Sequence, residues 1–138
     1  MLYFLRDLNG SAAAVFFISA FHAILFLQSG LDKVFDYTGN RQWLDEHFGK
    51  SILKNSVGAL LPVLTLLELA SGIVSAAAAL LFFVGFSKAT ALAGFSLSAG
   101  SFLALFFGQR VAKEYAGASS IAIYFAVNMI GLLALLYL

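Results

Sequence analysis

The sequence has no cysteine, one proline and few charged residues. Without cysteine the chain cannot form disulfides, zinc thiolate sites, iron–sulfur clusters or a thiol–disulfide relay. Charged residues make up 11% of its 138 residues, against about 25% in soluble domains. A net charge of +1 gives no basis for nucleic-acid binding. The low fraction of charged residues excludes a water-soluble domain.

Long apolar runs fill most of the chain. No charged residue lies in 8–31, 89–109 or 115–138, and 55–87 contains a single one, Glu68. Each run reaches the roughly 18 to 20 residues that cross a bilayer core of about 30 Å. The sequence predicts an all-α integral membrane bundle of four transmembrane helices, forming a single domain. The domain takes in residues 1–138, with spans at approximately 11–34, 57–85, 89–108 and 118–138.

The first loop carries a weaker helical pattern. Leu44, Phe48 and Ile52 recur every four residues, with charged residues on the other faces. This spacing is typical of a short amphipathic helix lying in the membrane interface. We predict such a helix in the segment 40–55, weakened or ended by Gly49.

The number of basic residues differs between the two ends of the predicted bundle. Arg6 and Lys88 lie at the end that carries the termini, and the other six Lys and Arg lie at the loop end. Cytoplasmic loops carry the excess of Lys and Arg. We therefore expect the long loop in the cytoplasm and both termini in the periplasm.

Four polar residues fall at similar depths in the four predicted spans. Glu68, His22, Ser98 and Asn128 lie about 12 to 15 Å from the loop-facing ends, at about 1.5 Å per residue. One interpretation is a proton-accepting or ligand-binding site, with His22 as the partner of Glu68 or as a hydrogen-bond donor to a quinone. The alternative is a polar clasp that fixes helix register. Two histidines are too few for most metal sites, so we predict no metal.

Two further groups of residues have structural or functional interpretations. Gln28, Asp32 and Lys33 form a charged and polar cluster at the end of the first span, either as a site or as an interfacial anchor for the loop. A stripe of small residues runs along the third span at intervals of four: Ser96, Gly100, Ala104 and Gly108. Small residues let helices approach closely, so we expect the stripe to contact a helix of the bundle or of a partner.

Two stretches resemble the DoxX-like family of small four-helix bacterial membrane proteins. The first is FLQSGLDKVFDY, from Phe26 to Tyr37, with a Gly-Leu-x-Lys-hydrophobic-Phe element. The second, VLTLLELASGIVSAAAALLFFVG, places a membrane glutamate four residues before a glycine. Gly30, Lys33, Glu68 and Gly72 carry the resemblance, and Gly72 joins the predicted helix-packing residues.

The resemblance implies a multi-pass protein of the bacterial inner membrane. It also implies an accessory or structural subunit of a larger respiratory or redox complex, with the lipid bilayer and other membrane subunits as partners. Members of such a family need not share an activity, and we expect no catalysis by this chain alone. The alternative is a self-contained quinone- or lipid-binding membrane protein that uses Glu68 and His22. A proton path is less favoured, because one intramembrane carboxylate gives no relay.

Overall fold

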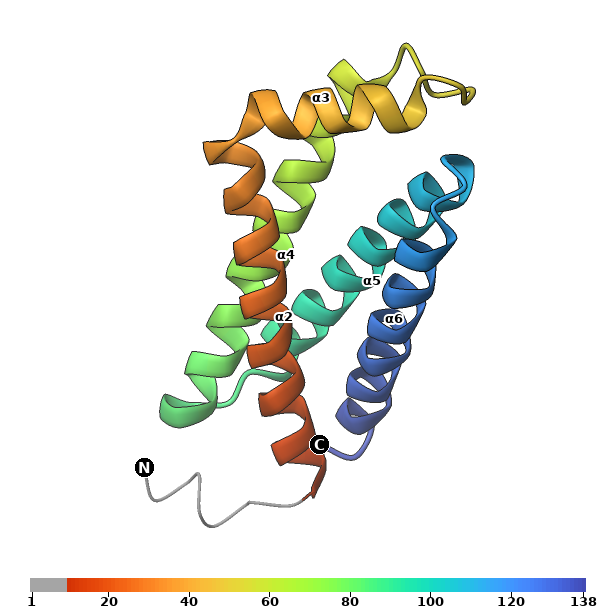
Figure 1. Ribbon diagram of the computed structural model, residues 1–138. Helices are drawn as coiled ribbons and strands as arrows, with labels where there is room; N and C mark the ends of the chain where they lie inside the picture. Colours follow the sequence, from red (N-terminus) through yellow and green to blue (C-terminus); the bar gives the residue numbers. More distant parts are fainter. Residues whose placement is uncertain (1–9) are drawn as a thin grey trace.

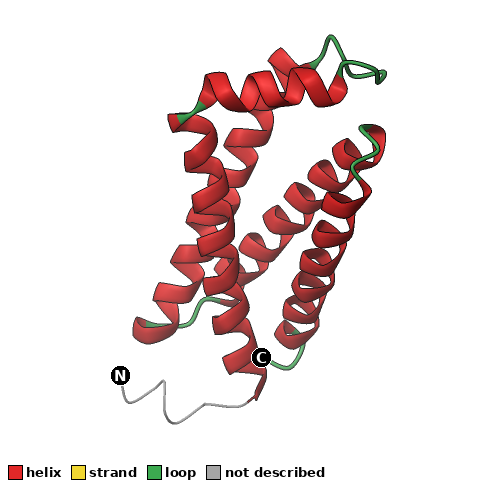
Figure 2. Cartoon of the chain, in the orientation of Figure 1, coloured by secondary structure: helices red, strands yellow, loops and turns green. Residues whose placement is uncertain are grey.

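A computed structural model describes residues 10–138, and this part of the chain is all helical (Figures 1 and 2). Arg6, used above in the charge comparison, lies outside the described residues. The helices are α2 (Gly10–Phe35), α3 (Tyr37–Phe48), α4 (Val57–Val84), α5 (Lys88–Val111) and α6 (Tyr115–Leu135). The predicted all-α class is confirmed, and α2, α4, α5 and α6 are long and apolar enough to span a membrane.

The turn between α5 and α6 is shorter than the sequence predicted. Lys113 has φ of 60°. Glu114 N donates to Gln109 O at 2.8 Å, and Lys113 N donates to Arg110 O at 3.2 Å. This is the Schellman pattern, which usually places glycine in the left-handed position. Because a lysine occupies that position, no glycine marked where α5 ends.

The helix in the first loop begins earlier than predicted. The Asp36 side chain accepts a hydrogen bond from Gly39 N at 3.3 Å and caps α3 at its N-terminus. The helix ends at Phe48, directly before Gly49. Ile52 lies beyond this end and is 86% exposed. Figure 1 shows α3 lying across one end of the bundle, opposite the end that carries the C-terminus.

The four long helices pack in a ring in which α2 contacts α4, α4 contacts α5, α5 contacts α6 and α6 contacts α2. Figure 1 shows the α5–α6 hairpin diverging from α2 and α4 toward the end covered by α3. Large apolar side chains such as Ile24, Leu66, Leu103 and Ile130 are more than half exposed on these helices. Such surfaces suit contact with lipid, and the four apolar helices indicate a multi-pass membrane protein.

Candidate functional site

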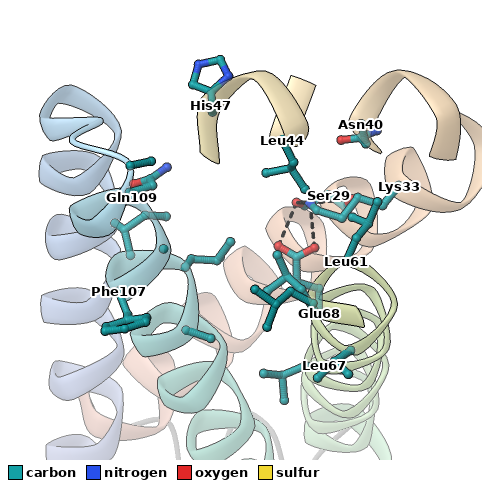
Figure 3. A pocket seen from close by; sticks show the side chains of 18 of the residues that line it. Ser29, Lys33, Asn40, Leu44, His47, Leu61, Leu67, Glu68, Phe107 and Gln109 are labelled. Atoms are coloured by element: carbon teal, nitrogen blue, oxygen red, sulfur yellow. Dashed lines mark hydrogen bonds and ion pairs between the residues drawn. The ribbon is translucent and has the colours of Figure 1, made fainter. Parts of the chain in front are cut away.

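The polar centre of the site joins α4 to α2. Figure 3 shows Glu68 facing Ser29 and Lys33. Lys33 Nζ lies 2.8 Å from Glu68 Oε2, and Ser29 Oγ donates to Glu68 Oε1 at 3.1 Å. The Glu68 side chain is 1% exposed and that of Lys33 is 13% exposed. Lys33 therefore supplies the counter-charge that a carboxylate buried in an apolar helix requires.

Two glycines bring α2 and α4 close enough for this ion pair. A Cβ added at Gly30 would lie 2.7 Å from Leu69 Cδ2 and 3.3 Å from Leu69 N. A Cβ added at Gly72 would lie 2.8 Å from Leu27 N. Side chains at either glycine would push the two backbones apart, so the crossing depends on both.

The four residues that carry the family resemblance thus have one structural setting. Gly30 and Gly72 form the close approach of α2 and α4, and the Lys33–Glu68 ion pair joins the same two helices. The sequence pattern is accounted for by helix packing together with burial of the ion pair.

A cavity of about 460 Å³ opens beside the ion pair, between α2 and α4 on one side and α5 and α6 on the other. Its walls are mostly apolar, and Ser29, Lys33 and Glu68 line it. Its size falls within the range of about 300 to 1,000 Å³ that is common for ligand pockets. Val63 and Phe107 also line it and are 63% and 58% exposed. The cavity therefore reaches the outer surface of α4 and α5, which is apolar.

Helix α3 covers the end of the cavity. Trp43, Leu44, His47 and Phe48 contribute to the lining. His47 Nε2 lies 3.1 Å from Glu114 Oε1, a contact that joins α3 to the start of α6. The Trp43 and His47 rings stack, with centroids 3.6 Å apart. The His47–Glu114 contact holds α3 across the splayed end of the bundle, and the ring stack lies within α3 itself.

The predicted polar layer separates into two levels. Glu68 contacts Ser29 and Lys33, and Ser29 lies seven residues beyond His22 on α2, about 10 Å along the helix. The expected pairing of His22 with Glu68 is therefore replaced by pairing with Lys33. The estimate of equal depth failed because it placed the loop-facing ends of the first two spans at one level. In the structure Gly30 of α2 packs against Leu69 of α4, so the two helices are offset along their axes.

His22 lies in an aromatic setting in the bundle core. It is fully buried, with the rings of Phe26, Phe95 and Phe102 at 5.5 to 5.9 Å. Both ring nitrogens lack a hydrogen-bond partner among the described residues. His22 does not line the cavity described above, so the quinone-donor role expected for it has no support from this geometry.

Ser98 and Asn128 remain near the level of His22. Asn128 Nδ2 donates to Phe95 O at 3.1 Å, which ties α6 to α5. Ser98 is fully buried on α5, between Phe95 and Phe102, whose rings both contact His22. These three predicted residues form the lower polar level, outside the lining of the cavity. Of the three, Asn128 makes a hydrogen bond between helices, and the polar side-chain atoms of Ser98 and His22 have no partner within residues 10–138.

The other predicted groups have different surroundings from those expected. Lys33 points to Glu68, whereas Asp32 Oδ2 accepts from Asn40 Nδ2 at 3.3 Å and Gln28 is exposed. These three residues therefore do not form a common cluster. Within residues 10–138, no group of three or more His, Cys, Asp or Glu side chains is placed to hold a metal ion.

The small-residue stripe of α5 lies mostly outside the bundle. Ser96, Gly100 and Ala104 are exposed, and a Cβ at Gly100 would meet no atom within 4 Å. Only Gly108 approaches another element, where an added Cβ would lie 3.4 Å from Phe48 Cζ. The face of α5 that packs inside the bundle is instead Ala91, Gly94, Phe95, Ser98, Ser101 and Phe102. Apart from Gly108, which approaches α3, and Ala104, which lines the cavity, the stripe lies on the outer face of α5.

Sequence reasoning missed two residues of the site, Ser29 and Gln109. Ser29 precedes Lys33 by one helical turn, a spacing that places both on one face of α2. Gln109 closes the third uncharged run and lines the cavity, and its buried Oε1 has no hydrogen-bond partner among the described residues. Figure 3 shows Gln109 across the cavity from Glu68. A polar side chain at the end of an apolar run was the available signal.

Comparison of the chain with protein-family models, with curated proteins and with solved structures gave no match. The resemblance to the DoxX-like family therefore stays a prediction from the sequence.

Proposed function

We propose that this chain binds a lipid-soluble amphiphile, a quinone or a lipid, in the cavity between its two helix pairs. The observation that carries the proposal is the Lys33–Glu68 ion pair in the wall of an otherwise apolar cavity. Apolar walls with a few convergent polar groups are typical of sites for small molecules. The ion pair and Gln109 fix the head group, and the apolar walls take the ring or chain.

The route of entry follows from the exposed wall residues. Val63 of α4 and Phe107 of α5 line the cavity and also face outward. An amphiphile in the bilayer could therefore pass between these helices without crossing water. The His47–Glu114 contact of α3 covers the polar end.

A variant that fills the cavity tests the proposal. Ala104 lines the cavity, so Ala104→Trp should reduce its volume while leaving the ion pair in place. Ala126→Trp, at an exposed position of α6 outside the cavity, is the matched control. Protein purified in mild detergent would be analysed by native mass spectrometry and lipid extraction. We expect a bound amphiphile in wild type and control and its loss in Ala104→Trp, whereas equal occupancy in all three would overturn the proposal.

Glu68→Gln separates a binding role from a packing role. The substitution keeps the size of the side chain and removes its charge. If Glu68 fixes the head group, the variant should still fold, at a cost in stability because Lys33 loses its counter-charge, and should lose most of the bound molecule. Unchanged occupancy would leave Glu68 as a structural partner of Lys33.

We propose an accessory-subunit role as a second candidate, which the family resemblance suggests. The observation in its favour is the exposed small-residue stripe, where Gly100 leaves open space for a partner helix. Gly100→Leu should then abolish co-purification of other membrane polypeptides without unfolding the chain. Recovery of the same polypeptides with the variant would reject the stripe as their contact.

A further inference from the structure

The ionisable groups that line the cavity, apart from the phenol of Tyr124, have partners within the chain. They are Lys33, His47, Glu68 and Glu114. Lys33 Nζ lies 2.8 Å from Glu68 Oε2, and His47 Nε2 lies 3.1 Å from Glu114 Oε1. Each basic group of the lining therefore faces a carboxylate, and neither is free to neutralise an anion. An anionic head group would meet two carboxylates with no uncompensated cation beside them.

Lys33 directs two of its three protons to Ser29 and its charge to Glu68. An ammonium has three donors. Lys33 Nζ contacts Ser29 Oγ at 2.9 Å, Ser29 O at 3.3 Å and Glu68 Oε2 at 2.8 Å. The Ser29 hydroxyl is in turn directed to Glu68 Oε1. The most polar part of the wall thus uses most of its own donors internally.

Acceptors, in contrast, remain available. A carboxylate offers about four acceptor positions. Glu68 accepts one hydrogen bond, from Ser29, beside its ion pair with Lys33. Gln109 Oε1 on the opposite wall is buried with no partner within residues 10–138. A buried acceptor without a donor is unfavourable, so a ligand that supplies one is favoured over a ligand that does not.

We propose that the cavity selects an uncharged amphiphile whose head group carries a hydroxyl that donates its proton to Gln109 Oε1. This inference rests on the proposed binding function and adds the chemistry of the head group. A quinol ring and the free alcohol of a diacylglycerol share that chemistry. A quinone lacks the donor, and a phosphatidic acid replaces the alcohol with an anion.

Matched ligand pairs test the selection directly. Delipidated wild-type protein in detergent would be titrated with decylubiquinol against decylubiquinone under anaerobic conditions, and with dioleoylglycerol against dioleoyl phosphatidic acid. Native mass spectrometry gives the bound fraction. We expect at least about tenfold tighter binding of the hydroxyl-bearing member in whichever pair is bound. The pair that binds identifies the source of the head group.

Two glutamine variants test which residue is responsible for the preference for a hydroxyl. Gln109→Leu removes the unpartnered acceptor and should reduce the preference to less than about threefold. Gln28→Leu changes an exposed glutamine of α2 outside the cavity and should leave the preference unchanged. Equal binding of both members of a pair to wild type would overturn the hydroxyl inference and leave the binding function standing. Absence of saturable binding by all four compounds would overturn both.

Discussion

At the scale of single residues, the molecule depends on one charge pair placed in an apolar setting. Glu68 is 1% exposed, and its nearest cation is Lys33 on a different helix. Removing one partner of a buried pair leaves the other charge uncompensated, which typically costs about 3 to 5 kcal/mol. Replacing both partners with apolar residues avoids that penalty.

A double-mutant cycle should measure this dependence. We expect Lys33→Met and Glu68→Leu each to lower the free energy of unfolding by about 3 kcal/mol. The double variant should lose clearly less than the sum, because no charge is left alone. The exposed pair Arg41–Asp45, at 3.0 Å, is the control and should contribute less than about 1 kcal/mol. Unfolding in mixed micelles gives these values, and additive losses at Lys33 and Glu68 would contradict the expectation.

The sequence predicted only part of this site. Glu68 was recognisable because it is the single charge in its run, and depth along the helix suggested His22 as its partner. The partner in the structure is Lys33, and it is set by how α2 and α4 cross. Counting residues along each helix gives a depth but does not give that crossing. Ser29 was missed for the same reason.

At the scale of elements, helix existence was predictable and helix contacts were not. Apolar length alone predicted the four spans, which correspond to α2, α4, α5 and α6. The contact faces depend on which small residues turn inward. Gly72 lies at the α2–α4 crossing, whereas Gly100 of the regular α5 stripe points outward. In α5, therefore, the periodic stripe of small residues is not the face that packs against the other helices.

Gly72→Ala should separate these two classes of glycine. Its Cβ would lie 2.8 Å from the backbone nitrogen of Leu27. Because a backbone atom cannot move aside without displacing α2, we expect a loss of about 1 to 3 kcal/mol. Gly100→Ala should be neutral or stabilising by up to about 1 kcal/mol, since alanine favours the helix and nothing opposes its methyl group. Equal effects in the same unfolding assay would reject this assignment.

The α5–α6 turn allows a stabilising substitution. Lys113 has φ of 60°, a conformation that glycine adopts without steric cost. Lys113→Gly should raise the free energy of unfolding by about 0.5 to 1 kcal/mol. Lys113→Ala keeps a Cβ and should give no gain. A gain of the same size in both variants would assign it to loss of the lysine charge.

At the scale of the whole molecule, two helix pairs meet closely at one end and diverge at the other. Because the two pairs diverge, a cavity lies between them, and α3 covers its end. None of this was contained in the predicted spans, because helix tilt is set by contacts between side chains of distant segments. The orientation of the bundle in the membrane, however, remains a prediction that the charge distribution makes.

Single-cysteine labelling tests that orientation. The chain has no cysteine, so labelling has no background. Lys50→Cys lies in the loop predicted to be cytoplasmic, and Phe86→Cys lies between α4 and α5 at the opposite end. In intact spheroplasts, an impermeant maleimide should label Phe86→Cys, and Lys50→Cys should react only after the membrane is opened. The reverse pattern would place the long loop outside.

The glycine-mediated crossing of α2 and α4 also bears on how the chain is inserted during synthesis. α2, with Lys33 near its end, is synthesised before α4, which carries Glu68. A charge in the middle of a lone helix raises its insertion free energy by about 2.5 to 3.5 kcal/mol. Pairing with α2 removes that penalty, so we expect these two helices to leave the translocon together. We expect α5 and α6 to follow this pair, so that the cavity closes only after the crossing of α2 and α4 has formed.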